Sequence, residues 1–164
     1  MTFFVVDTNV PVVANGDTPQ ATLTCVLACV QALREMVENG GVVLDDDMRI
    51  LREYMGYLSR SGEPGMGDAF FKWVWDHQAD DTRCERVPIT TRSGSAHDFE
   101  EFPDDPELRG FHRDDRKFVA VALASKNAPE ILNAVDTDWW VHREALAHHG
   151  VRVKFLCPAE MNSG

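Results

Sequence analysis

The sequence is poor in basic residues and has no long apolar run. Its 164 residues include 16 Lys and Arg against 27 Asp and Glu, which gives a formal net charge of −11. A protein that holds nucleic acid by nonspecific electrostatic attraction normally carries the opposite sign, so this class is excluded. No apolar stretch reaches the roughly 18–20 residues that a bilayer crossing needs, and we therefore expect no membrane association.

Cysteine is also scarce, and its four positions form no CxxC pair. Cys25 and Cys29 stand four residues apart in a helical apolar pattern, so we interpret them as small core side chains rather than ligands. The N-terminus has no basic segment, and its apolar stretch stops at Asp7, which argues against a signal peptide. Together these features predict a cytoplasmic protein.

The remaining composition is that of a globular protein, with 44% apolar and 26% charged residues. The length suits one domain with its own core, so we expect a single domain over residues 1–164 without internal repeats. Residues 59–113 form an extended, insertion-like region. Its second half, residues 90–113, is polar and acidic and lacks periodicity, which is typical of a long functional or mobile loop.

Short apolar segments alternate with segments of helical periodicity. Strands are expected at residues 3–6, 42–44, 86–89, 131–135 and 151–156. Helices are expected at residues 18–38, 45–58, 69–77, 114–126 and 139–149. Thr18 is the expected N-cap of the first helix, with Pro19 at its first position. This alternation predicts an α/β fold with a mainly parallel sheet of four or five strands.

Acidic residues follow the expected strands at the edge where parallel sheets bind ligands. Asp7 ends the first strand, and Asp136 and Asp138 follow the fourth. Asp115 begins the helix before the fourth strand, and Glu53 lies in the helix after the second. A single Asp in such a place is most often a turn or cap residue.

Several carboxylates that converge on one place are a different case. Two carboxylates about 4–5 Å apart repel by roughly 3–4 kcal/mol at an effective dielectric near 20. Mg²⁺ or Mn²⁺ suits such oxygen ligands.

The order of these segments resembles the pattern of the PIN-domain nucleases. In that family an N-terminal apolar strand ends in Asp-Thr-Asn, and a Glu follows in the second helical region. An Asp then begins an Ala-rich helix, and one or two Asp follow the fourth strand. The matching segments here are Val5-Val6-Asp7-Thr8-Asn9-Val10, Ile50-Leu51-Arg52-Glu53-Tyr54, residues 115–124, and Ala134-Val135-Asp136-Thr137-Asp138. The resemblance covers nearly the whole chain and implies a three-layer α/β/α fold.

The resemblance implies a metal-dependent nuclease that cleaves RNA, or flexible or single-stranded DNA, with endonucleolytic cleavage of RNA favoured. The implied catalytic residues are Asp7, Glu53, Asp115 and Asp136. The implied ligands of Mg²⁺ or Mn²⁺ are Asp7, Asp115, Asp136 and Asp138. The residues expected at the substrate are Asn9, Arg116 and Lys117, where Asn9 would also hold Asp7 in place. Asp114 precedes Asp115, and we assign the ligand to Asp115 because the inward-facing Phe118 follows it by three positions.

Partners and alternatives stay open at this stage. With a net charge of −11, a nuclease needs a local basic strip, a basic or regulatory protein partner, or a small substrate. A toxin-like or defence effector with a partner, and an oligomer, are compatible with the family analogy. One alternative function is a non-catalytic PIN-like module that binds proteins. The other is a haloacid-dehalogenase-type phosphatase, since Val135-Asp136-Thr137-Asp138 matches its hydrophobic-Asp-x-Asp element. Trp139 and Trp140 are interpreted as core or interface residues.

Overall fold

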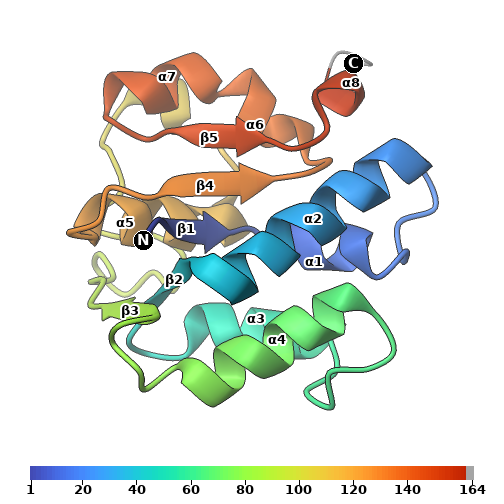
Figure 1. The fold of residues 1–164 in the computed structure, drawn as a ribbon. Coiled ribbons are helices and arrows are strands. Elements are labelled where there is room, and N and C mark those ends of the chain that lie inside the picture. The colour runs from blue at the N-terminus through green and yellow to red at the C-terminus, as the bar shows by residue number, and fades with distance from the viewer. Residues whose placement is uncertain (162–164) are drawn as a thin grey trace.

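Five parallel strands form one sheet in the order β3-β2-β1-β4-β5 (Figure 1). The structure is a computed structural model and describes residues 1–161. The strands are β1 (Phe3–Val6), β2 (Gly41–Asp45), β3 (Cys84–Val87), β4 (Glu130–Asn133) and β5 (Val153–Phe155). Each neighbouring pair runs parallel. The predicted α/β fold with a parallel sheet is thus confirmed.

Helices cover the sheet on both sides and complete a three-layer α/β/α architecture (Figure 1). On one side lie α1 (Asn9–Ala14), α2 (Leu23–Asn39) and α4 (Met66–His77), which pack against one another. On the other side α5 (Arg116–Ala124) contacts β1, β2 and β4. The remaining helices are α3 (Arg49–Tyr57), α6 (Thr137–Val141), α7 (Arg143–His148) and α8 (Pro158–Met161), with 3-10 turns at Pro106–Leu108 and Arg113–Asp115.

The central strands are apolar because helices cover both of their faces. All five residues of β2 are buried, as are Val5 and Val6 of β1. Tyr54 of α3 lies fully buried against Phe70 and Phe71 of α4 in edge-to-face contacts. Its hydroxyl donates a hydrogen bond of 2.5 Å to the carbonyl of Val6. The core therefore reaches the end of β1, directly beneath Asp7.

The structure departs from the predicted helices in three places: one helix begins later, one is divided in two, and one was not predicted. The helix expected at 18–38 begins at Leu23, because a turn in which Ala21 N–H donates to Thr18 C=O precedes it. Its N-cap is Thr22, which accepts a hydrogen bond from the backbone N–H of Cys25. The helix expected at 139–149 is divided at His142 into α6 and α7. The short helix α1 was not predicted, because it follows β1 with only two residues between them.

The long loop over residues 90–113 is tightly packed. Phe99, Phe102, Leu108 and Phe111 are buried, and an isolated antiparallel bridge joins Thr91 to Phe99. These buried apolar side chains hold the loop in place, although its sequence shows no periodicity. The expectation of a long loop without regular strands or α-helices agrees with this arrangement.

The cysteine prediction needs correction. Cys25 and Cys29 are buried in the core as expected, but Cys25 forms a disulfide with Cys157, 132 positions away. Cys29 and Cys84 are free and buried. Sequence spacing could not reveal this pair, because the fold alone brings the segment after β5 next to the first turn of α2. Since disulfides are rare in reducing compartments, the cysteine argument for a cytoplasmic protein no longer holds.

None of the helices within residues 1–161 has the length and apolar character that a bilayer crossing requires.

Candidate metal centre

Three aspartates converge at the carboxyl edge of the sheet. Asp7 follows β1, Asp136 follows β4 and caps α6, and Asp115 lies immediately before α5. One carboxylate oxygen from each lies within 4.8 Å of the others. The convergence follows from the topology, because β1 and β4 are hydrogen-bonded neighbours whose ends meet. The three side chains line a cavity of about 530 Å³, which we call the acidic cavity.

Asp7 is fixed on both of its carboxylate oxygens. Its Oδ1 accepts a hydrogen bond of 2.9 Å from the backbone N–H of Asn9, and its Oδ2 accepts one of 2.7 Å from the indole Nε1 of Trp139. The residue is only 4% exposed. Burial raises the pKa of Asp7 to about 6, and the charge of Asp136 adds to this rise while the two hydrogen bonds oppose it. Asp7 is therefore held in one orientation, with a carboxylate that is costly to ionise.

Asp115 is the most strongly perturbed acid of the group. Burial, and after it the charges of Asp7 and Asp136, together raise the pKa of Asp115 to about 9. Asp136 accepts a hydrogen bond of 3.0 Å from the backbone N–H of Asp138, which is the N-cap bond of α6. Within residues 1–161, none of the three clustered aspartates forms an ion pair with a basic side chain. Without a basic partner, the cluster limits its own repulsion at neutral pH by keeping a proton on Asp115.

The donor set fits a hard divalent cation. The three carboxylates offer anionic oxygen ligands, and the acidic cavity beside them leaves room for waters or a substrate group. Mg²⁺ and Mn²⁺ prefer such ligands and retain several waters when bound. Asp7, Asp115 and Asp136 are thus the residues that could hold an ion here.

Glu53 lies in the same cavity, but its charge is already matched. Its Oε1 is 2.7 Å from the Nζ of Lys117, and its Oε2 accepts a hydrogen bond from the hydroxyl of Thr8. Lys117 also donates to the backbone carbonyl of Asp114. The side chains of Glu53 and Lys117 are 24% and 12% exposed, so the pair is partly screened from solvent. Lys117, expected at the substrate, is paired with Glu53 and does not itself line the acidic cavity.

Asp138 lines the acidic cavity without joining the three clustered aspartates. Its Oδ2 accepts a hydrogen bond of 2.8 Å from the backbone N–H of His112, and its Oδ1 is 3.2 Å from the Nδ1 of His142. These contacts direct Asp138 towards the long loop. Asp138 therefore supports the long loop beside the site.

The other two expected substrate residues, Asn9 and Arg116, are held by contacts within the protein, and Asn9 also lines the acidic cavity. The Asn9 amide donates 2.9 Å to Oδ1 of Asn133, and its own Oδ1 accepts from the backbone N–H of Ala134 at 2.8 Å. These bonds tie the end of β1 to the end of β4 and so bring Asp7 and Asp136 together. The guanidinium of Arg116 donates to the carbonyls of Phe111 and Arg109 and contacts Asp98. It supports the long loop and does not line the acidic cavity.

Sequence reasoning missed the indole of Trp139 as a partner of Asp7. The residue is fully buried, as expected of a core side chain, and its ring also packs edge-to-face on Phe111. Its place three residues after Asp136 was a usable signal, because the first turn of a helix capped by Asp136 must lie beside the acid cluster.

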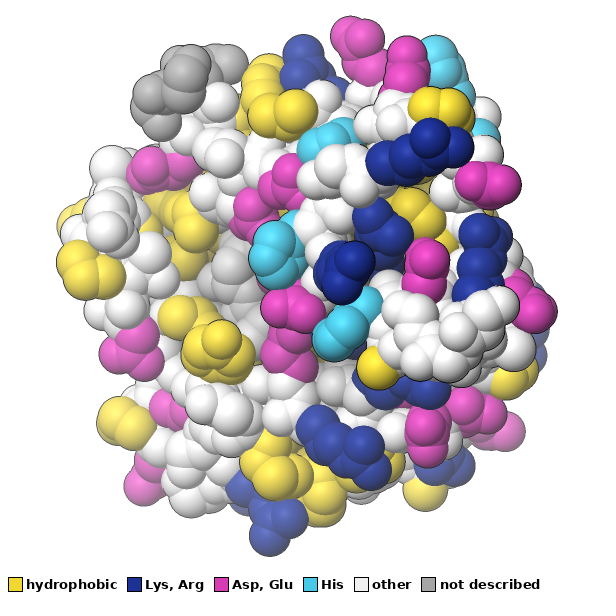
Figure 2. Space-filling view, turned by 180° about the vertical axis from the view of Figure 1, so that it is seen from behind, with side chains coloured by type: hydrophobic (Ala, Val, Ile, Leu, Met, Phe, Trp, Pro, Cys, Tyr) yellow, Lys and Arg dark blue, Asp and Glu magenta, His cyan; other side chains and the backbone are white. Residues whose placement is uncertain are grey.

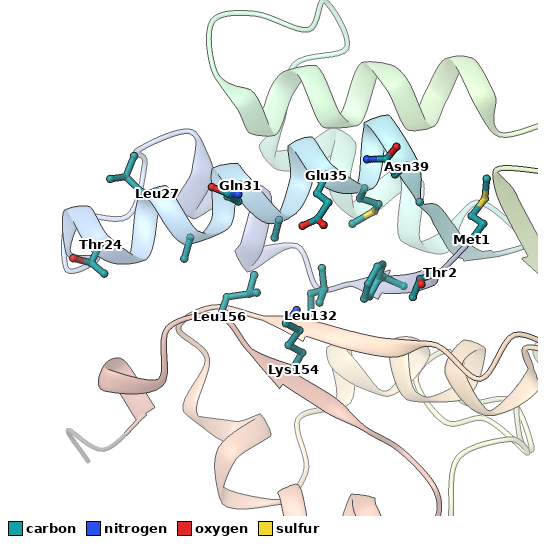
Figure 3. A pocket seen from close by; sticks show the side chains of 15 residues that line it. Met1, Thr2, Thr24, Leu27, Gln31, Glu35, Asn39, Leu132, Lys154 and Leu156 are labelled. Atoms are coloured by element: carbon teal, nitrogen blue, oxygen red, sulfur yellow. The ribbon is translucent and has the colours of Figure 1, made fainter.

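A separate concavity of about 620 Å³ lies between α2 and the sheet (Figure 3). Leu27, Gln31, Glu35 and Asn39 lie along α2 on one side, and Leu132, Lys154 and Leu156 lie across from them. This groove contains none of the acidic residues predicted for the site. The residues that line this groove therefore do not offer the clustered carboxylates of the acidic cavity.

Comparison with known proteins adds no relative, since no protein-family model, no curated protein and no solved structure matches this chain.

Proposed function

We propose that this protein is a metal-dependent nuclease that hydrolyses phosphodiester bonds of single-stranded RNA, or of flexible DNA, and that it is PIN-like. The observation that carries the proposal is the approach of Asp7, Asp115 and Asp136 within 4.8 Å without a basic partner among residues 1–161. Three carboxylates at this separation need protons or cations to balance them. A divalent ion bound there would relieve the repulsion.

The proposed chemistry uses the acids according to their surroundings. Asp7, Asp115 and Asp136 would hold Mg²⁺ or Mn²⁺. Such an ion, when bound, supplies Lewis-acid stabilisation of the phosphoryl oxygens and lowers the pKa of a water ligand. The bonds from Asn9 and Trp139 keep Asp7 in a fixed orientation, so its position costs no reorganisation during the reaction.

Glu53 and Lys117 would act at the other side of the acidic cavity. The Lys117 ammonium, 2.7 Å from Glu53, offsets part of the negative charge that would otherwise repel a phosphodiester. Glu53 accepts a hydrogen bond from Thr8, next to Asp7 in the chain, so the pair is linked to the end of β1. We assign Glu53 the role of a proton acceptor or water-orienting group that Lys117 releases when substrate binds.

The phosphatase alternative has less support. Its hydrophobic-Asp-x-Asp element would need both Asp136 and Asp138 at the reacting phosphate, but Asp138 is engaged by His112 and His142. A non-catalytic binding module would have no use for one buried and two half-buried carboxylates without a basic partner, because their mutual repulsion costs stability.

The test is cleavage of a labelled single-stranded oligonucleotide by the purified protein with Mg²⁺, with Mn²⁺ and with EDTA. We expect metal-dependent cleavage of RNA that falls at least about 100-fold in Asp7→Asn, since removal of one metal-binding charge weakens transition-state stabilisation by several kcal/mol. Asp104→Asn is the matched control, because this exposed acid lies outside the acidic cavity. Equal turnover by wild type and Asp7→Asn, or none by the wild type with any metal on RNA or DNA, would overturn the proposal.

A further inference from the structure

A second cavity, of about 600 Å³, adjoins the acidic cavity, and Glu53 and Asp114 line both. We call it the basic cavity after its four cationic side chains, Arg49, Arg52, Arg113 and Lys117. Three carboxylates, those of Asp47, Glu53 and Asp114, share its lining. The excess of positive charge is unusual in a chain with a net charge of −11. The positive charge on the face shown in Figure 2 is likewise local, with groups of Lys and Arg side chains among acidic ones.

The four cations differ in their partners. Arg49 lies 3.6 Å from Asp45 and 3.4 Å from Asp47, and Lys117 is paired with Glu53. Arg52 and Arg113 are exposed, and within residues 1–161 neither side chain makes a hydrogen bond or an ion pair. Two guanidinium groups in a concave surface are therefore available to an external anion. Arginine suits phosphate in particular, because its planar fork can donate two parallel hydrogen bonds.

The wall of this cavity is built by the long loop. Thr91, Ala96 and His97 line it from the loop, while Arg49 and Arg52 come from α3. Phe99 is 2% exposed at its base, and the Arg49 guanidinium lies 5.4 Å from the centre of that ring. The bridge between Thr91 and Phe99 holds the loop in this shape. The insertion-like region therefore forms a built surface beside the acid cluster.

We propose that the basic cavity binds the sugar-phosphate backbone of a single-stranded nucleic acid on one side of the bond to be cleaved, with Arg52 and Arg113 as its phosphate contacts. This inference rests on the proposed function, which supplies the scissile position in the acidic cavity. The shared lining by Glu53 and Asp114 makes the path from one cavity to the other continuous. A strand that follows this path from the acidic cavity would place its neighbouring phosphates over the basic one.

A flexible strand fits this arrangement better than a duplex or a mononucleotide. Asp7 is 4% exposed at the base of its cavity, so a phosphodiester must bend inward to reach it. A duplex resists such bending, since its persistence length is about 150 base pairs. A mononucleotide has no further phosphate with which to occupy the basic cavity. The substrate is therefore expected to span at least two phosphates.

The test measures binding separately from cleavage. Fluorescence anisotropy of a labelled ten-nucleotide RNA, in EDTA to prevent turnover, is compared for the wild type, Arg52→Ala/Arg113→Ala and Arg34→Ala/Arg86→Ala. The last pair is the matched control, because both arginines are exposed, lie outside the two cavities and change the net charge equally. We expect the cavity variant to bind at least about tenfold more weakly and to lose about 1.4 from the log-log salt slope, the value for two single-strand phosphate contacts.

Each outcome decides the inference. Equal affinity and slope in the cavity and control variants, or no RNA binding by the wild type, would overturn it. A loss confined to the cavity variant supports it, even if the wild type with metal proves unable to cleave, and in that case only the proposed function fails. Inorganic phosphate serves as competitor. If about 1 mM phosphate displaces the RNA completely, the site recognises a free phosphate and the strand proposal is overturned.

Discussion

The indole Nε1 of Trp139 donates a hydrogen bond of 2.7 Å to Oδ2 of Asp7, although the two residues are 132 positions apart in the chain. The bond joins the first turn of α6 to the end of β1. It is made to a buried carboxylate, and it opposes the effect of burial on the pKa of Asp7. A core side chain and a candidate metal ligand therefore depend on one another.

Trp139→Phe should raise the pKa of Asp7 above about 6, because the substitution removes a donor to the charged form. A hydrogen bond to a charged group contributes about 1.5–3 kcal/mol, which corresponds to a rise of about 1–2 pH units. The acid limb of the cleavage profile should move to higher pH by that amount. Trp140→Phe is the control, since Trp140 packs on Phe155 and Arg143 instead. Coincident pH profiles for the two variants would show that the indole bond does not tune Asp7.

The acid cluster should make the metal-free protein less stable as the pH rises. The ordinary pKa of an aspartate is near 3.8, while that of folded Asp7 is about 6 and that of folded Asp115 about 9. Between about pH 4 and pH 9 the folded state keeps protons that the unfolded state has lost, so the free energy of unfolding falls across this window. Urea denaturation in EDTA at pH 5, 7 and 9 measures the slope. A flat profile would contradict the clustering of the carboxylates.

Asp115→Asn should remove most of that slope and reduce the effect of metal. The amide carries no titrating proton, so the cost of keeping Asp115 protonated at a pH where the unfolded chain ionises disappears, and the metal-free variant should be more stable than the wild type at pH 8. Added Mg²⁺ or Mn²⁺ should raise the melting temperature of the wild type and raise that of the variant much less. Thermal melts with and without metal measure both effects. Asp114→Asn is the control, and an equal response to metal by this variant and Asp115→Asn would refute the assignment of Asp115.

Lys117→Met should destabilise the fold by about 1–3 kcal/mol, because it leaves the partly buried Glu53 without its counter-charge. Glu53→Gln combined with Lys117→Met should recover part of the lost stability, because the double variant no longer has an unpaired carboxylate at this position. Denaturant unfolding of the wild type, both single variants and the double variant gives the coupling free energy. If the changes in the free energy of unfolding are additive, the ion pair itself contributes nothing to stability.

Reduction of the Cys25–Cys157 disulfide should lower the free energy of unfolding by about 3–5 kcal/mol, since the bond closes a loop of well over a hundred residues. Cys25→Ser should show the same loss and no further sensitivity to reductant. Because Cys29 and Cys84 are buried, alkylation in denaturant without reductant, followed by mass spectrometry, should label these two thiols. Four alkylated cysteines under these conditions would contradict the bond.

Much of the fold was predictable because its signals are local. Apolar strands alternating with amphipathic segments predict a parallel sheet, and parallel strands bring Asp7 and Asp136 to one edge. The places of Asp7, Asp115 and Asp136 near strand ends predicted their approach provided that the first and fourth strands were neighbours, and in the structure those strands pair and the three carboxylates lie within 4.8 Å. The fold class is confirmed, whereas the metal and the reaction stay predictions.

The parts that could not be predicted depend on side-chain direction and on tertiary contacts. Arg116 and Lys117 are adjacent in sequence, but successive residues of a helix point about 100° apart. One consequently supports the long loop while the other pairs with Glu53. The disulfide to Cys157 was not predicted for a similar reason. Local sequence patterns do not show which distant segments the fold brings together.

The position of Asp136 in the chain has a consequence for synthesis. β4 is inserted beside β1 only after residues 130–133 exist, so the third clustered aspartate arrives when more than four-fifths of the chain has been made. Under the proposed function, a nascent chain that is still short of that point has only two of the three clustered carboxylates, and we expect it to be inactive.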